Sequence, residues 1–175
     1  MKDNTLINTR IFNHSLEQVW SVRSQADLIK EWWWPNGFTN TIDIFEFREW
    51  GKWEVTMHGP NWADYKNSII FKEIIPQKSI HLYHLPNPWF DAKIIFVPLD
   101  EKTTAVSTHQ IFENVSDCET LKKFLPTANE ENFDRQEVFL KKNIYNTIKW
   151  IKNTLIYLYK RGWPSLQYLD FYSQV

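Results

Sequence analysis

The chain has 175 residues, of which 43% are hydrophobic and 23% are charged, and its formal net charge at pH 7 is -1. These values are typical of one folded domain, and they exclude a disordered chain and a protein attracted to nucleic acid by its overall charge. A single cysteine, Cys118, excludes an intramolecular disulfide and a cysteine-based zinc cluster.

The first third of the chain predicts one strand and two short helices. The strand is expected over residues 8–12, and a helix follows from Ser15, whose side chain suits the N-cap position, to about residue 22. A second short helix is expected over residues 27–33, because Pro35 and Gly37 end it.

Six further strands are expected, at residues 41–47, 52–58, 65–75, 79–84, 89–98 and 103–112. The first contains one irregularity in its alternation, whereas 52–58 alternates regularly, with Trp53, Val55 and Met57 on one face. The connections are short and contain proline or polar residues, which is typical of an antiparallel meander. Helical patterns begin near residue 116, so the order of elements indicates an α+β fold.

The C-terminal third predicts a basic amphipathic helix. Its apolar residues recur at spacings of three and four, at Ile144, Ile148, Ile151, Leu155 and Leu158. This stripe is interpreted as a packing face, with an anionic membrane surface or a partner protein as the alternative. Trp150 and Ile156 fall outside the stripe, which is compatible with a homodimer contact. Gly162 ends the helix, and a last helix is expected through Leu166, Leu169 and Tyr172.

Several short motifs occur in an order that matches a known family. They are Arg10 and Phe12, Val19-Trp20, Trp32-Trp33, Pro35, Gly37-Phe38-Thr39, Gly51-Lys52-Trp53, Met57-His58-Gly59-Pro60, Tyr65, Phe71, Glu73-Ile74, Pro76, Thr103, His109, Gly162-Trp163, Leu166, Leu169 and Tyr172. In this order they resemble the stand-alone form of the heat-shock-protein-90 ATPase activator homologues, which are START-like (SRPBCC) proteins. Residues 114–160 lie outside the resemblance.

The resemblance implies an α+β helix-grip fold. In this fold a curved antiparallel sheet of about six to seven strands wraps around a long C-terminal helix. We expect a single START-like domain over residues 1–175, with residues 114–160 as a helical insertion before the closing helix. The true chaperone activators carry an additional N-terminal domain, for which this chain has no room, so chaperone binding is not expected.

Three tryptophans stand where the family usually has glycine: Trp34, Trp50 and Trp62. Glycine permits tight turns and positive φ, which a bulky side chain resists. Either the turns differ in this chain, or the additional indoles cover a surface or partly fill the pocket.

The resemblance also implies an internal cavity between the sheet and the closing helix. A chain with 10 tryptophans has the large rigid rings that line a pocket for an apolar guest. If His109 faces inward, as the resemblance implies, then Ala105, Ser107 and Ile111 share its face. We therefore predict binding of a small hydrophobic or amphipathic molecule, with Tyr65 and His109 as polar anchors. The predicted ligand-binding residues are Trp33, Trp53, Met57, Tyr65, Phe90, Ser107 and His109.

Two other functions remain open from the sequence. One is a small cyclase or hydrolase that uses His109 or His58 to transfer a proton in the pocket. The other is a non-catalytic interaction protein, in which Trp34 and Trp62 close the cavity and Trp150 and Ile156 form an exposed patch.

No cofactor and no metal site are expected. His81 and His84 lie on opposite faces of one strand and cannot share a metal ion. We also expect no membrane span and no signal peptide, because no apolar run of about 18 residues occurs, and hence a cytoplasmic protein.

One charged residue lies in an otherwise apolar strand. Arg10 needs a partner if it is buried, and Glu46, Glu54 or Glu73 could provide it, although an exposed salt link is the default interpretation.

Overall fold

The structure is a computed structural model that describes residues 4–85 and 87–160, with the backbone alone for residues 144–148 and 158–160. The chain divides into two compact units, Met1–Leu140 and Lys141–Val175. The predicted last helix through Leu166, Leu169 and Tyr172 lies outside the described residues.

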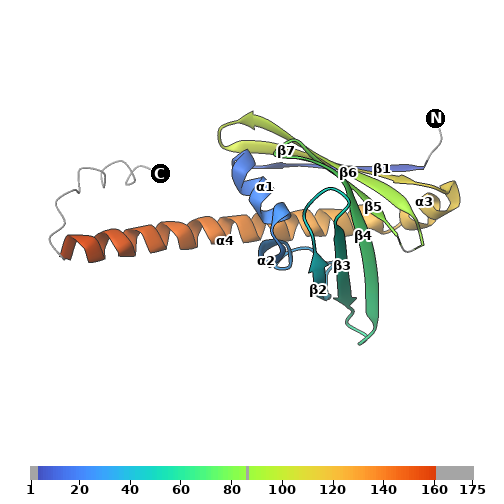
Figure 1. The fold of residues 1–175 in the computed structure, drawn as a ribbon, viewed down its shortest axis with the longest axis horizontal. Helices are drawn as coiled ribbons and strands as arrows, with labels where there is room; N and C mark the ends of the chain where they lie inside the picture. The colour runs from blue at the N-terminus through green and yellow to red at the C-terminus, as the bar shows by residue number, and fades with distance from the viewer. Residues whose placement is uncertain (1–3, 86, 161–175) are drawn as a thin grey trace. The chain divides into compact units, whose positions relative to one another are not determined.

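The first unit is built on one curved antiparallel sheet (Figure 1). Its seven strands follow the order β1-β7-β6-β5-β4-β3-β2, so β1 and β2 form the two edges. The strands are β1 Thr5–Phe12, β2 Thr39–Phe45, β3 Lys52–His58, β4 Asp64–Ile75, β5 Ser79–His84, β6 Phe90–Asp100 and β7 Thr103–Phe112. All seven predicted strands are present, and β3, β5 and β7 have the predicted ends.

Alternation along the strands determines which side chains enter the core. In β3 Trp53 and Val55 are buried, and in β5 Ile80 and Leu82 are buried, while the residues between them are more exposed. The predicted irregularity in the first of these strands is confirmed as a register shift between Ile42 and Ile44 where β2 pairs with β3. Such a bulge bends the strand and increases its twist.

Four helices accompany the sheet: α1 Leu16–Ser24, α2 Ala26–Ile29, α3 Val115–Leu121 and α4 Leu125–Lys160. Ser15 caps α1 as predicted, because its Oγ accepts from the N–H of Gln18 and the Gln18 side chain accepts from the N–H of Ser15. Helix α2 ends four residues earlier than predicted, at Ile29 rather than residue 33. Pro35 disfavours helical backbone at the residue before it, and the intervening residues form turns.

The helix that packs against the inner face of the sheet is the first part of α4, up to Leu140 (Figure 1). Phe133 and Leu140 belong to the main core, and the ring of Phe133 meets that of Phe12 edge to face at 5.8 Å. This packing helix lies inside residues 114–160, where the sequence predicted an insertion, and only the short helix α3 precedes it. The closing helix therefore begins earlier in the chain than expected.

Arg10 joins the edge strand β1 to α4. Its guanidinium binds Glu130 at 2.6 Å and Asp134 at 2.8 Å. The hydrogen bonds that Arg10 donates to these two carboxylates raise its pKa above the usual value. The predicted partners Glu46, Glu54 and Glu73 are therefore wrong, because the ionic partner comes from the helix under the sheet rather than from another strand.

From Lys141 onward, α4 belongs to the second unit. The predicted basic helix is present there, and Trp150, Ile156 and Tyr157 are exposed on it. No helix among the described residues is both long enough and apolar enough to cross a membrane.

Candidate functional site

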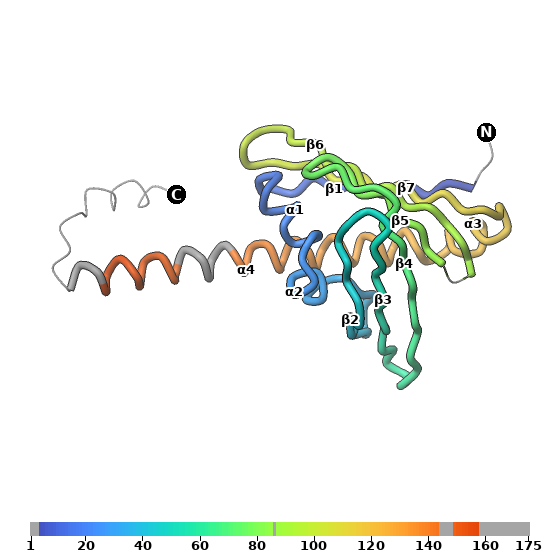
Figure 2. The backbone as a smooth tube through the Cα atoms, viewed as in Figure 1, coloured from blue at the N-terminus to red at the C-terminus, as the bar shows by residue number. Residues whose placement is uncertain are grey.

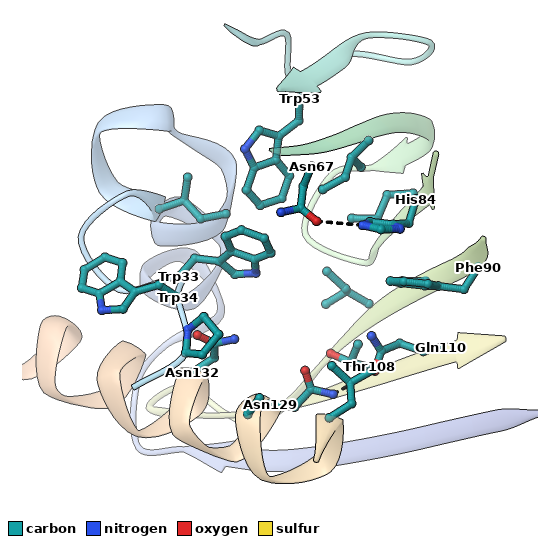
Figure 3. A pocket seen from close by; sticks show the side chains of 18 of the residues that line it. Trp33, Trp34, Trp53, Asn67, His84, Phe90, Thr108, Gln110, Asn129 and Asn132 are labelled. Carbon is teal, nitrogen blue, oxygen red and sulfur yellow. Dashed lines mark hydrogen bonds between the residues drawn. The ribbon is translucent and has the colours of Figure 1, made fainter. Parts of the chain in front are cut away.

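A pocket of about 300 Å³ lies in the first unit, between the inner face of the sheet and α4 (Figure 3). Strands β3 to β7 form one wall, and Leu125, Ala128 and Phe133 of α4 help to form the other. The segment after α2 contributes Trp32, Trp33, Trp34 and Pro35 to the lining. Several distant parts of the chain thus contribute to one concave site.

Aromatic rings form much of the wall. Trp33 and Trp53 lie against each other at 4.7 Å, and Trp53 stacks on Phe71 at 6.1 Å with an interplanar angle of 6°. Trp and Phe offer large rigid surfaces, so an apolar guest would contact them with little loss of side-chain freedom. The aromatic lining residues are Trp32, Trp33, Trp34, Trp53, Phe71, Phe90 and Phe133.

The run Trp32-Trp33-Trp34-Pro35 follows α2 and supplies one end of this wall. Trp32 is 1% exposed, and its indole N–H donates to the carbonyl of Val22 at 3.0 Å. Arg135 of α4 holds the same segment, because its Nε donates to the Trp32 carbonyl and its guanidinium lies 5.8 Å from the centre of the Trp34 ring. These contacts leave Trp33 and Trp34 lining the pocket.

His84 is the histidine of the pocket. It lies at the end of β5 and stacks on Phe90, with ring centres 4.6 Å apart and nearly parallel planes. Its Nε2 lies 2.9 Å from Asn67 Oδ1 (Figure 3), and its Nδ1 lies 3.1 Å from the carbonyl oxygen of Pro88. Both ring nitrogens are thus engaged within the protein.

A second polar group lies where β7 faces α4 (Figure 3). The Asn129 amide donates to Gln110 Oε1 at 2.8 Å and to Asn8 Oδ1 at 3.0 Å. Thr108 and Asn132 also line the pocket. Such groups orient a ligand in an otherwise apolar site.

Arg23 of α1 also lines the pocket, and it is 7% exposed. Its guanidinium donates to Gln136 Oε1 and lies 4.9 Å from the centre of the Trp32 ring. Burial lowers the pKa of Arg23 to about 9, so the group is still a cation at neutral pH.

Four of the seven predicted ligand-binding residues line the pocket: Trp33, Trp53, Met57 and Phe90. Tyr65 does not line it; it is 45% exposed, and its ring packs against Phe38. Ser107 and His109 do not line it either.

The predicted orientation of β7 is wrong. Thr104, Val106 and Gln110 are buried, whereas Ser107 and His109 lie on the outer face and bond to each other at 2.9 Å. Ala105 and Ile111 share that outer face. Strand β7 presents Thr108 and Gln110 to the pocket instead.

Neither of the two predicted catalytic histidines lines the pocket. His109 lies on the outer face, and His58 bonds to Asp64 at 2.7 Å and to Thr41 at 2.9 Å at an exposed position. The cyclase or hydrolase hypothesis required one of these two imidazoles in the cavity, and neither is there. Among the described residues no cluster of three or more His, Cys, Asp or Glu could hold a metal ion.

Sequence reasoning missed the polar lining of α4. Leu125, Ala128, Asn129, Asn132 and Phe133 all line the pocket, and their spacings of three, one, three and one follow one face of a helix. This periodicity is visible in the sequence. A search for apolar residues does not find this helix face, because two of its residues are asparagines. The sequence therefore predicted a packing face in the more apolar stripe after residue 143.

The tryptophans at usual glycine positions behave in two ways. Trp34 lines the pocket, whereas Trp50 and Trp62 retain positive φ, at 59° and 63°. Trp62 is 97% exposed, so it does not close the cavity as the interaction hypothesis required. The turns at Trp50 and Trp62 therefore have the positive φ that usually requires glycine. Their backbone is strained, because a residue with a bulky side chain resists the left-handed region.

A curved antiparallel sheet that holds a pocket against a helix defines the START-like, helix-grip class of protein. More narrowly, the chain belongs to the family described as Activator of Hsp90 ATPase homolog 1-like protein, whose sequence profile matches residues 13–141. The match includes α3 and the part of α4 that packs on the sheet. No curated protein matches the chain.

Solved structures of three bacterial proteins share the fold. A protein from Arthrobacter aurescens has a TM-score of 0.74 at 16% identity, covering 80% of this chain and 87% of its own. One from Rhodobacter sphaeroides has a TM-score of 0.74 at 17% identity, covering 80% and 94%. One from Nitrosomonas europaea has a TM-score of 0.73 at 16% identity, covering 81% and 96%. At such identities the likeness concerns the fold alone.

Proposed function

We propose that this protein binds a small hydrophobic or amphipathic molecule in the pocket between the sheet and α4. The observation that carries the proposal is an aromatic-walled space of about 300 Å³ that contains a few separated polar groups. Protein interiors are normally packed as densely as organic crystals, whereas this partly open pocket leaves room for a guest between the sheet and α4. It is about ten times the volume that one water molecule occupies in the liquid.

The lining can supply part of the energy for micromolar binding. A ring removed from water contributes at most on the order of 2 kcal/mol, and Trp33 and Phe90 are half-buried rings of the lining, whereas Trp53 is already buried. Micromolar affinity needs about -8 kcal/mol after association costs, so the ligand's own buried surface must contribute as well. A guest of roughly ten to fifteen non-hydrogen atoms matches the volume at normal packing density.

The test has two steps: detection of a bound small molecule, and a substitution that fills the pocket. Native mass spectrometry of freshly purified protein should show a retained small molecule, and isothermal titration calorimetry should show binding of the neutral probe 2-naphthamide. Ala128→Phe places a ring in the pocket and should reduce the probe's affinity by about 10-fold or more.

The matched control is Ala105→Phe, which adds the same ring on the outer face of β7. This variant should bind the probe as the natural protein does. A bare mass together with no heat from 2-naphthamide would contradict the proposed function, as would equal weakening by the two variants.

A further inference from the structure

Arg23 is the one permanently charged side chain among the described residues that line the pocket. No Asp or Glu of the described chain lies within 4.0 Å of its guanidinium, and the lowering of its pKa has burial as its cause. Buried charges in proteins are normally paired, because an unpaired ion in a low-dielectric interior is costly. Among the described residues, this buried cation therefore has no carboxylate to neutralise its charge.

The hydrogen-bonding capacity of Arg23 is also largely unused. A guanidinium has five N–H donors in a planar fork, and the described chain accepts one hydrogen bond from it, at Gln136 Oε1. Arg23 Nε is enclosed and has no partner in the described residues. The rings of Trp32, Phe133 and Phe96, centred 4.9, 5.7 and 6.0 Å away, attract the cation but do not replace acceptors for N–H groups in its plane.

Other arginines of the first unit are paired differently. Arg10 has two carboxylates, and Arg48 has Glu46 at 3.1 Å. Arg135 donates to the amide oxygens of Asn36 and Asn132 and to the Trp32 carbonyl. Arg23 is more buried than these, and its one acceptor among the described residues is a neutral amide oxygen.

We propose that the pocket takes a monocarboxylate, whose head group binds Arg23 and whose apolar body lies against the aromatic wall. This inference rests on the proposed function and specifies its ligand class. A carboxylate matches the guanidinium fork with two parallel hydrogen bonds and supplies the missing negative charge. The charge of Arg23 and the aromatic rings then serve one ligand.

A single carboxylate fits better than a phosphate. A phosphate ester carries about -1.5 to -2 charges at neutral pH, and one guanidinium neutralises only part of this. The described lining offers no lysine and no second unpaired arginine, since Arg23 is its one permanent charge. An excess negative charge would therefore be left in an apolar space.

The test compares two probes of the same shape in the natural protein. The carboxyl group of 2-naphthoate titrates near pH 4 and is ionised at neutral pH, whereas 2-naphthamide is neutral. Calorimetry at pH 7.5 should show at least about 10-fold tighter binding of 2-naphthoate, because charge-assisted bonds to Arg23 are stronger than neutral ones. Arg23→Met should remove this preference while changing the affinity for 2-naphthamide by less than about 2-fold.

Arg48→Met is the matched control, because it removes the same charge from an exposed position that does not line the pocket. It should keep the preference for 2-naphthoate. Equal affinity for the two probes in the natural protein would overturn the carboxylate inference and leave the proposed function standing. This comparison uses the natural protein, so it tests the inference even where Arg23→Met does not fold. Absence of binding by both probes would overturn the proposed function and the inference with it.

Discussion

Thr108 and His109 are neighbours on β7, yet they lie on opposite faces of the sheet. Thr108 lines the pocket, whereas His109 Nε2 bonds to Ser107 Oγ on the outer face. Strand β7 pairs with β1 on one side and with β6 on the other, and both registers hold it in this orientation. Of its inward residues, Thr108 and Gln110 line the pocket.

This orientation predicts that substitution by phenylalanine at two adjacent positions of β7 has different effects on ligand affinity. Thr108→Phe should fill part of the pocket and weaken the binding of 2-naphthamide by about 10-fold or more, because overpacking leaves the guest no room. His109→Phe should leave the affinity within about 2-fold. Calorimetry on both variants measures this difference, and a larger loss with His109→Phe would show that the face is assigned wrongly.

Trp62 offers a test of backbone strain. Its φ is 63° and its side chain is 97% exposed, so little packing is lost when the indole is removed. Trp62→Gly should stabilise the protein by about 0.5–1 kcal/mol, because glycine adopts positive φ without a Cβ clash.

Trp62→Ala is the matched control for this variant. Alanine also removes the indole but keeps the unfavourable Cβ, so its free energy of unfolding should stay near that of the natural protein. Thermal unfolding should show Trp62→Gly melting about 2–4 °C above Trp62→Ala. Identical melting temperatures for the two variants would refute a strain at this position.

Gly51 is required for steric reasons. A Cβ at this position would lie 2.0 Å from the carbonyl oxygen of Glu46 and 2.9 Å from that of Arg48, both backbone atoms that cannot move away freely. Gly51→Ala should therefore destabilise the protein by about 3 kcal/mol or more.

Gly37→Ala provides the comparison, because Gly37 has a φ of 78° and its nearest neighbour to an added Cβ is Pro60 at 3.7 Å. Its cost should be limited to the conformational penalty of about 1–2 kcal/mol. Urea unfolding of both variants gives the two free energies. A smaller loss at Gly51 than at Gly37 would contradict the close approach of these backbone segments.

The unpaired charge of Arg23 predicts a gain in stability when it is removed together with its neighbour. In the double variant Arg23→Met, Gln136→Leu, apolar side chains replace a buried cation and the amide that contacts it. Such replacements are neutral or stabilise proteins by about 1–4 kcal/mol. The ligand-free double variant should therefore melt at or above the temperature of the natural protein. A lower melting temperature would mean that the stacking on Trp32 and the bond to Gln136 outweigh the cost of burying the charge.

Much of the sheet was predictable because its signals are local. Residues 52–58, 79–84 and 103–112 are strands with the predicted ends, since polar or proline-containing turns separate runs of extended residues. The bulge in β2 was visible as a break in alternation, and Ser15 was recognisable as an N-cap. Four aromatic or apolar lining residues also followed from the resemblance and from residue type.

Only the tertiary structure determined which face of β7 enters the pocket. Its two faces have similar small and polar residues, so hydrophobic contrast does not distinguish them, and the choice depends on pairing with β1 and β6. The packing part of α4 was hidden for the same reason, because Asn129, Asn132 and Gln136 lie on its inner face.

The sequence by itself determined the order of the elements and the family, because both depend on patterns between neighbours in the chain. The site depends on residues that are distant in sequence, such as Arg23 and Gln136, which are 113 positions apart. Whether a buried arginine is paired is decided by which side chains the fold brings around it, and α4 brings an amide to Arg23 where a carboxylate would have neutralised it.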